Sequence, residues 1–224
     1  MFLRHAFALV SHADVKHEMA AQLKVVLNGT KPAIWRRLQV PGCANLGWLH
    51  AVIQVATGWT NSHLHQFRIG NQVCTDPAFQ LDEFEGDLPI LDERKTVLMK
   101  VAPQVGAVLG YEYDFGDSWG HAISIEKILP PDAAATTTAR CLDGVRSCPP
   151  EDCGGISGYA SLLKIIKNPK HAEHDFMMEW LGGGFDPEAF DAEEANTYLR
   201  MLKWPRVTEA HLRKVLMARD DYRE

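Results

Sequence analysis

The sequence predicts an α+β fold, in which a mainly antiparallel sheet with hairpins and one inserted helix is followed by a helical C-terminal part. Pairs of segments in the first part show the period-two alternation of side chains that is typical of strands. Beyond a low-complexity connector, apolar residues recur at helical spacing instead. The expected parts are a flexible extension (1–20), a single domain (21–203, with the sheet at 21–129, the connector at 130–140, and a loop and helices at 141–203) and a C-terminal helix (204–224).

The first predicted hairpin joins residues 22–27 to residues 34–40 through the turn-forming run 28–32. Arg36 and Arg37 are neighbours in its second strand, so they point to opposite faces of the sheet. At most one of them can point away from the core. We expect that arginine to be solvated or to form an ion pair.

A helix is predicted over 46–57, because apolar residues recur along one face of this segment. Asn45 is suited to cap its start and Gly58 to end it. His50 lies next to the apolar stripe. We interpret it as a packed or half-exposed side chain rather than as a ligand.

The run at 62–70 is predicted to be a strand with His63 and His65 on one face. Two imidazoles at alternate positions of a rigid strand suit a transition metal if a third ligand converges on them. The alternative is that both histidines are hydrogen-bonded. The acidic stretch 76–93 is predicted to be a solvated loop, and 96–101 a further strand.

The centre of the sequence is a predicted hairpin between 111–115 and 121–128, where aromatic and acidic residues alternate. Loops of two or of four residues give the same register and place Asp114 opposite His121. Such a pair would orient a base or a metal ligand. The alternative is that Asp114 and Asp117 only hydrogen-bond the backbone of the turn.

Beyond the connector, residues that start and stop helices mark out the helical segments. These are a helix capped by Ser157 that ends before Pro169, one with its apolar face at 176–181 stopped by the glycines 182–184, a helical turn at Asp186-Pro187, and one capped by Asp191 and Glu194 that reaches Leu202. The last segment, 208–219, is a basic amphipathic helix. Its Arg213, Lys214 and Arg219 are the predicted nucleic-acid contacts, and a peripheral helix is the alternative.

Composition narrows the class of protein. With 46% hydrophobic and 23% charged residues among 224, the chain is typical of a globular protein. Its net charge of -6 gives no general attraction to nucleic acid or anionic lipid, so either partner would need a local basic patch. No apolar run approaches 18 residues, so no membrane partner is expected. Five cysteines, an odd number, fit reduced thiols in the cytoplasm.

A second polar group follows the connector. The rigid pair Pro149-Pro150 presents Glu151 and Asp152 at a defined corner of the backbone. The nearby cysteines lack the paired spacing of a zinc site. The candidate cluster therefore consists of His63, His65, Asp114, Asp117, His121, Glu151 and Asp152, with His63, His65 and His121 as the candidate ligands of a divalent metal.

Several motifs occur together in a recognisable order. They are Gly58-Trp59 before His63-Leu64-His65, the run 113–119 with His121, and Pro149-Pro150-Glu151-Asp152 before Gly154-Gly155 and Gly158-Tyr159. This order resembles the plasmid pRiA4b ORF-3-like family over residues 21–203. The resemblance implies an α+β domain of unestablished biochemical function, some of whose members are labelled transposon passenger (TnpR-like) proteins. No recombinase signature accompanies it, and Cys148 and Cys153 depart from the expected pattern.

Three functions fit these observations. The first is a binding or accessory module associated with mobile elements, with a nucleic acid or a protein as its partner. The second is a metal-assisted, hydrolase-like enzyme in which the candidate residues converge in one cleft and a divalent metal is the cofactor. The third is a structural interaction domain, in which the same residues serve only as turns and caps.

Overall fold

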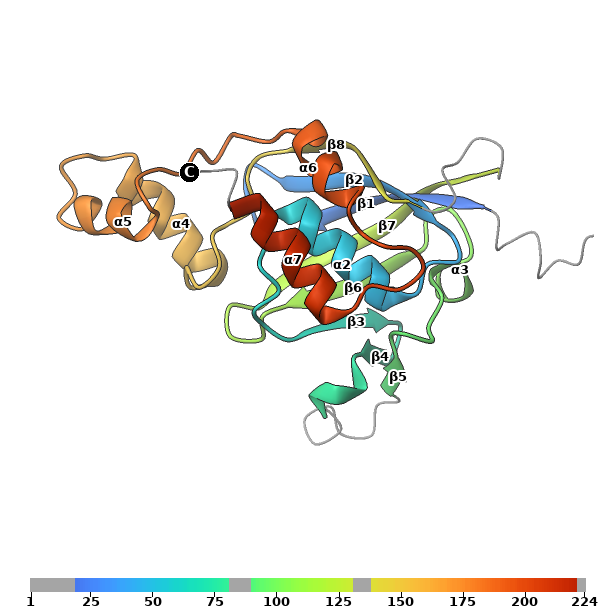
Figure 1. Cartoon of the computed structure of the whole chain (residues 1–224). Coiled ribbons are helices and arrows are strands. Elements are labelled where there is room, and N and C mark those ends of the chain that lie inside the picture. The colour runs from blue at the N-terminus through green and yellow to red at the C-terminus, as the bar shows by residue number, and fades with distance from the viewer. Residues whose placement is uncertain (1–18, 81–89, 131–137, 221–224) are drawn as a thin grey trace, which may run out of the picture.

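A computed structural model describes residues 19–80, 90–130 and 138–220 of the chain (Figure 1). The predicted extension at 1–20 lies almost entirely outside the described residues, as does most of the connector. Within them the α+β fold is confirmed. A mostly antiparallel sheet is formed mainly by the first part of the chain, and helices of the later part pack over it.

The sheet has eight strands in the order β5-β4-β3-β6-β7-β1-β2-β8. Both predicted hairpins form, and β1 pairs with β7 to join them into one sheet. Among the described strands, the β4–β5 pair is the parallel one. The strands are β1 (Ala20–Leu27), β2 (Ile34–Pro41), β3 (His65–Ile69), β4 (Gln72–Thr75), β5 (Ile90–Asp92), β6 (Val108–Tyr113), β7 (Trp119–Leu129) and β8 (Arg140–Val145).

The helices fall into two groups. In Figure 1, α2, α6 and α7 lie over the sheet, whereas α4 and α5 pack against each other at one end of the molecule. The helices are α2 (Leu46–Thr57), the 3-10 helix η1 (Pro77–Phe79), α3 (Leu98–Val101), α4 (Gly155–Ile166), α5 (His174–Trp180), α6 (Ala192–Leu199) and α7 (Glu209–Asp220). The helix starts predicted from Asn45 and Asp191 are confirmed, since both side chains accept hydrogen bonds from the first turns of α2 and α6.

Helix α2 forms the centre of the core. It contacts β2, α6 and α7, and all but one of its residues are buried. A helix that is buried on nearly every side must be apolar nearly all round, as this one is. Gly58 ends it in the left-handed conformation, with φ of 83°, as the sequence predicts.

The adjacent arginines of β2 behave as predicted, since one points inward and the other outward. Arg36 is buried, and its guanidinium donates hydrogen bonds to the carbonyl oxygens of Ala56, at 2.9 Å, and Val145, at 3.1 Å. Arg37 lies on the opposite face and forms an ion pair with Glu126, with 2.7 Å between Nε and Oε2.

Several predictions about local structure are wrong. Ser157 does not cap a helix, because α4 begins at Gly155 and its cap residue is Gly154. The register pairs His121 with Tyr111 and Trp119 with Tyr113, so the loop runs over 114–118 and Asp114 does not face His121. The segment predicted as a strand at 96–101 forms the short helix α3, because Leu98 and Met99 are buried by one helical turn. The strand β8 was not predicted from its mixed sequence; it pairs with the edge of β2.

The C-terminal segment is part of the core rather than an appendage. Leu212, Val215 and Leu216 of α7 are buried within the main hydrophobic cluster. The indole nitrogen of Trp48 in α2 donates a hydrogen bond to the carbonyl oxygen of Lys203, at 3.2 Å. The Trp48 ring also meets the Trp204 ring edge to face, with 4.9 Å between centroids and 88° between planes.

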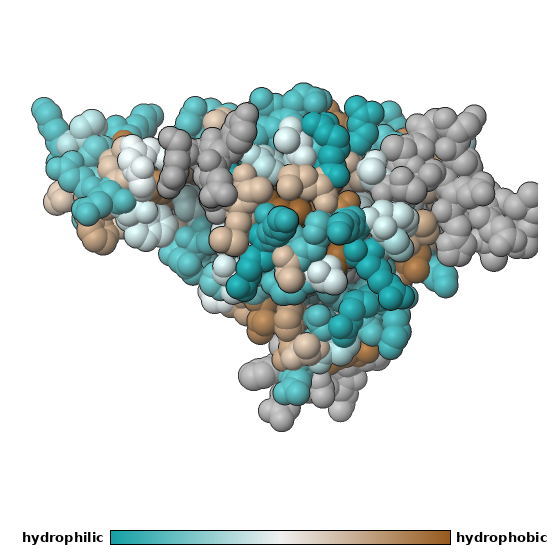
Figure 2. Space-filling view, viewed as in Figure 1, coloured by the Kyte–Doolittle hydropathy of each residue, from teal (hydrophilic) through white to brown (hydrophobic). Residues whose placement is uncertain are grey.

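The surface seen in Figure 2 is mostly hydrophilic, and apolar residues appear on it in smaller patches. Among the described helices, none has the length and apolar character needed to cross a membrane. All five cysteines are free thiols.

Candidate functional site

Three loops that are far apart in the sequence meet beside the start of β3. The loop before β3 carries His63, the β6–β7 loop carries Asp114, and the loop before α4 carries Asp152. His63 Nε2 lies 3.3 Å from Asp152 Oδ1 and 3.7 Å from Asp114 Oδ2. Among the described residues, this is the one group of three or more metal-ligand side chains whose ligand atoms all lie within 4.8 Å of one another. We call it the His63 cluster.

The His63 ring nitrogen that faces the two carboxylates is buried and makes no hydrogen bond within the described structure. Its ring packs edge to face against Tyr113, with 5.8 Å between centroids, which fixes its orientation. Exposure rises across the cluster, because the Asp114 side chain is 9% exposed and that of Asp152 72%. The cluster therefore opens to solvent on the Asp152 side.

Asp114 is held in place by its own loop. Its backbone is left-handed, with φ of 58°, a conformation that Asp tolerates better than most residues. Its Oδ1 accepts hydrogen bonds from the backbone N–H of Gly116, at 2.9 Å, and of Asp117, at 3.4 Å. This turn chemistry is one of the two roles that the sequence predicts for Asp114, and it leaves Oδ2 directed at His63.

The neighbour of Asp152, Glu151, anchors the loop before α4. Its carboxylate accepts hydrogen bonds from the Tyr113 hydroxyl and from the Thr60 backbone N–H and hydroxyl, the last two at 2.8 and 2.6 Å. The Tyr113 hydroxyl in turn accepts a hydrogen bond from the Ser62 N–H at 2.9 Å. Burial, followed by the hydrogen bond to Glu151, raises the pKa of Tyr113, so the phenol stays protonated and remains a donor.

Asp117 joins the same loop to the hairpin. Its Oδ2 accepts a hydrogen bond from the Gly154 N–H at 3.1 Å. Gly155 has φ of +65°, and a Cβ there would lie 2.5 Å from the Asp117 carbonyl oxygen. Only glycine permits this approach. Asp117 and Glu151 thus support the cluster rather than belong to it.

Two of the predicted site residues lie elsewhere. His65 points away to Glu93, with 2.8 Å between Nε2 and Oε2. His121 is buried beside Trp59 and Tyr111, and burial lowers its pKa to about 4. The structure therefore does not gather His63, His65 and His121 around one position, because β3 begins at His65 and His63 belongs to the preceding loop.

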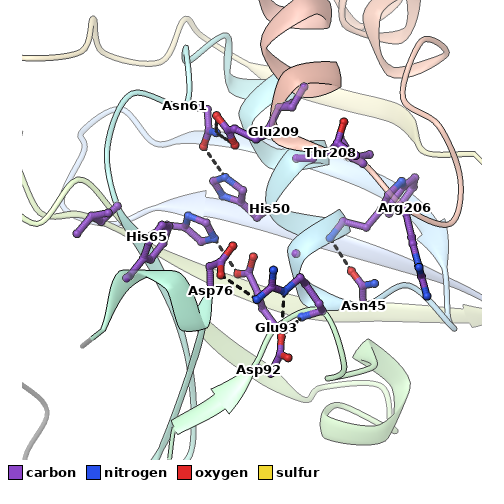
Figure 3. Close-up of a pocket in the computed structure, with 18 of the residues that line it drawn as sticks. Asn45, His50, Asn61, His65, Asp76, Asp92, Glu93, Arg206, Thr208 and Glu209 are labelled. Carbon is purple, nitrogen blue, oxygen red and sulfur yellow. Dashed lines mark hydrogen bonds and ion pairs between the residues drawn. The ribbon is translucent and has the colours of Figure 1, made fainter. Parts of the chain in front are cut away.

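A second polar group lines a cavity of about 880 Å³ between α2, β3 and the segment that leads into α7 (Figure 3). His50 and His65 stack face to face, with 3.3 Å between ring centroids and 3° between planes. His50 is hydrogen-bonded to the Tyr111 hydroxyl, at 2.9 Å, and to Asn61 Oδ1, at 2.6 Å. Because Asn61 Oδ1 can only accept, His50 Nε2 carries the proton and Nδ1 accepts from Tyr111.

Glu93 is the residue of this group that the sequence does not reveal. It was predicted to lie in a solvated loop, but it is 5% exposed. Burial raises its pKa to about 7, and burial lowers the pKa of His65 to about 3. A carboxyl group and an imidazole with such values share one proton without separating charge. The apolar pair Ile90-Leu91 just before it was the available signal of burial.

Of the predicted nucleic-acid contacts, Arg213 and Lys214 are exposed on α7. Arg219 is turned inward. Its Nη1 donates a hydrogen bond to the carbonyl oxygen of Val55 at 2.8 Å, and its side chain is 11% exposed. The predicted basic surface is therefore smaller than the sequence suggests.

Known proteins similar to this chain identify its family. The family described as "Plasmid pRiA4b ORF-3-like protein" has a sequence model that matches residues 19–194, which contain all three loops of the His63 cluster. The chain belongs to the plasmid pRiA4b ORF-3-like family. The chain is also similar to the uncharacterized protein y4hQ of Sinorhizobium fredii (strain NBRC 101917 / NGR234), with 40% identity over 190 residues, which are 83% of this chain and 94% of that protein.

A solved structure is also similar. It is the crystal structure of a protein of unknown function, MM3350, from Methanosarcina mazei Go1, which shares 34% identity with a TM-score of 0.68. The match covers 79% of this chain and 97% of that one. This similarity supports the fold described above. The names of both relatives state no activity.

Proposed function

We propose that this protein binds a divalent cation through the His63 cluster and acts as a metal-assisted, hydrolase-like enzyme. The observation that carries the proposal is the buried His63 Nε2, which faces carboxylate oxygens of Asp152 and Asp114 and hydrogen-bonds neither of them. Donor atoms bound to one small cation at about 2 Å lie roughly 3 to 3.5 Å apart. The two distances from Nε2, 3.3 and 3.7 Å, are close to that separation.

The donor set favours particular cations. One imidazole nitrogen and two carboxylate oxygens suit Zn²⁺ or Mn²⁺ rather than a metal that prefers thiolates. Two carboxylates also balance the charge of a divalent ion. The free cysteines are not part of the cluster.

The exposed side of the cluster supports a catalytic rather than a structural cation. Structural zinc sites are closed by four protein ligands, whereas catalytic sites keep a position open. The cluster supplies three protein ligands, and because one of them, Asp152, is exposed, the fourth position is open toward solvent. A divalent cation there would lower the pKa of a bound water, which is the basis of metal-assisted hydrolysis.

Isothermal titration calorimetry of the chelator-treated full chain with Zn²⁺ and with Mn²⁺ tests cation binding. We expect saturable binding, and we expect Asp152→Asn to weaken it by roughly tenfold or more, since a neutral amide is a poorer ligand. Asn tolerates the left-handed backbone of position 152, φ 60°, so this variant should fold. Asp175→Asn, which changes an exposed acid on α5, is the matched control and should bind as the wild type does.

Two outcomes would contradict the proposal at different steps. Equal affinity of the wild type and Asp152→Asn would reject the cation site. Cation binding without any cation-dependent hydrolysis of ester and phosphoester substrates would retain the site and reject the hydrolase-like activity.

A binding or accessory role in mobile elements is the second candidate. Arg213 and Lys214 on the outer face of α7 favour it, because they offer a small basic patch on a chain of negative net charge. Contact of this kind would be electrostatic, so it predicts a nucleic-acid gel shift that is lost as the salt concentration rises. A shift that does not depend on salt, or no shift at low salt, counts against it.

A further inference from the structure

The cavity of Figure 3 adjoins the His63 cluster, since His63 is one of its lining residues, but the carboxylates Asp114 and Asp152 do not line it. Its floor consists of His50, His65 and Glu93, each at most 5% exposed. Its volume of about 880 Å³ is in the range of pockets that hold small molecules. Phe79 and Leu212 add apolar wall between these polar groups.

Most charges on the cavity wall are already paired. Arg94 binds Asp76, at 3.1 Å, and Lys95 binds Asp92, at 3.1 Å. Glu209 accepts hydrogen bonds from the Asn61 amide at 3.0 and 3.1 Å. These contacts leave the paired acids little capacity to attract a cation.

Arg206 is the exception. It lines the cavity and has no ion pair or hydrogen bond with any residue that the structure describes. Figure 3 shows it on the opposite wall from His65. A guanidinium without a partner in a concave site typically binds a carboxylate or phosphate group, to which it donates two parallel hydrogen bonds.

The floor also has unused hydrogen-bonding capacity. His65 Nδ1 is buried without a partner among the described residues. A buried polar atom without a partner is destabilising, so a ligand that supplied one would be favoured. The His65 ring stacks on His50 and is hydrogen-bonded to Glu93 through Nε2, so its Nδ1 is held in place before a ligand arrives.

We propose that this cavity binds a small anionic molecule, with Arg206 holding its carboxylate or phosphate group and Glu93 and His65 hydrogen-bonding its polar body. The site does not depend on the proposed cation, because none of these residues belongs to the His63 cluster. It would recognise a ligand by the distance between one negative group and one hydrogen-bonding group. The raised pKa of Glu93, about 7, adds to this by letting the carboxyl group act as donor or acceptor near neutral pH.

Nuclear magnetic resonance titration of the full chain tests the proposal, with inorganic phosphate and acetate as separate probes, at constant ionic strength and with a chelator present. We expect saturable shifts of the cavity residues with at least one probe, and the probe that binds more tightly identifies the class of anion. Arg206→Gln should weaken that binding about tenfold. Lys203→Gln, an exposed cation on the same segment that does not line the cavity, should change it less than about twofold.

Equal affinities of the wild type and Arg206→Gln, or no saturable shift with either probe, would overturn the proposal. Arg206 is exposed, so its replacement should not prevent folding, and circular dichroism checks this. Glu93→Met provides an independent check, because it removes the hydrogen-bonding group and should weaken binding of an anion that carries a hydroxyl or amino group, such as lactate, more than it weakens binding of acetate. Asp152→Asn should leave all of these titrations unchanged, so failure here is distinct from failure of the cation site.

Discussion

Glu93 is the side chain whose behaviour is furthest from its ordinary chemistry. Burial raises its pKa from 4.5 to about 7, so the folded chain holds this proton more tightly than the unfolded chain does. The resulting stability is fully present below pH 4.5 and is lost as the pH rises through about 7. At neutral pH and above, the Glu93 carboxylate is therefore a source of instability inside the cavity.

Replacing Glu93 by Gln should isolate this effect. We expect the free energy of unfolding of the wild type, minus that of Glu93→Gln, to fall by about 3 kcal/mol between acid and mildly alkaline pH. Burial also lowers the pKa values of His50, His65 and His121, which removes stability as the pH falls below about 6.5 in both proteins. Urea unfolding at a series of pH values measures the difference, with the exposed Glu173→Gln as control. A difference that stays flat or rises with pH would refute this account.

At this scale the sequence predicts chemistry better than burial. His63, Asp114 and Asp152 could be proposed from their residue types and motifs, as could the supporting roles open to Asp117 and Glu151. Glu93 could not, because it lies in an acidic stretch where solvation is the simplest expectation. The apolar pair Ile90-Leu91 indicates burial nearby, but which carboxylate turns inward depends on a cavity built by α2 and β3.

At the scale of elements, β2 and the end of α2 are joined by Arg36. Its guanidinium donates to the Ala56 carbonyl in the last turn of α2, where a helix favours positive charge, and to Val145 on β8. It also lies over the Phe190 ring, 3.9 Å from the centroid. One side chain thus connects α2, β2 and β8.

The adjacent arginines form a matched pair for mutation. Arg36→Met should lower the free energy of unfolding by about 3 kcal/mol, because it removes the hydrogen bonds that a buried guanidinium donates to the carbonyl groups of Ala56 and Val145. Arg37→Met should lower it by less than about 1 kcal/mol, because it breaks only partly exposed ion pairs, with Glu126 and with Asp143. Equilibrium urea unfolding distinguishes the two, and similar losses in both variants would contradict the assigned roles.

Elements with strong local signals are predicted well, and those that depend on distant partners are not. The caps of α2 and α6 and the β1–β2 hairpin lie where turn and capping residues place them. The register predicted for β6 and β7 is wrong, because a five-residue loop with left-handed residues at Asp114 and Ser118 replaces the expected tight turn. The edge strand β8 follows from pairing with β2 and has no alternating pattern of its own.

For the whole molecule, the main question is whether α7 folds with the rest of the chain. Leu216 is 6% exposed within the shared core, while its neighbour Met217 is 60% exposed. We expect Leu216→Ala to lower the global free energy of unfolding by about 2 to 4 kcal/mol in a single transition. Met217→Ala should change it by less than about 0.5 kcal/mol. A separate early transition in the Leu216→Ala variant would instead mean that α7 unfolds on its own.

The edge-to-face contact between Trp48 and Trp204 gives the molecule a built-in optical probe. Two indoles at this separation couple electronically. Trp48 lies in the central helix α2, and Trp204 lies in the segment that leads into α7. Near-ultraviolet circular dichroism should therefore report directly whether this segment is packed against α2. Because this segment also carries Arg206, binding of a ligand in the adjacent cavity should change the near-ultraviolet signal without a label.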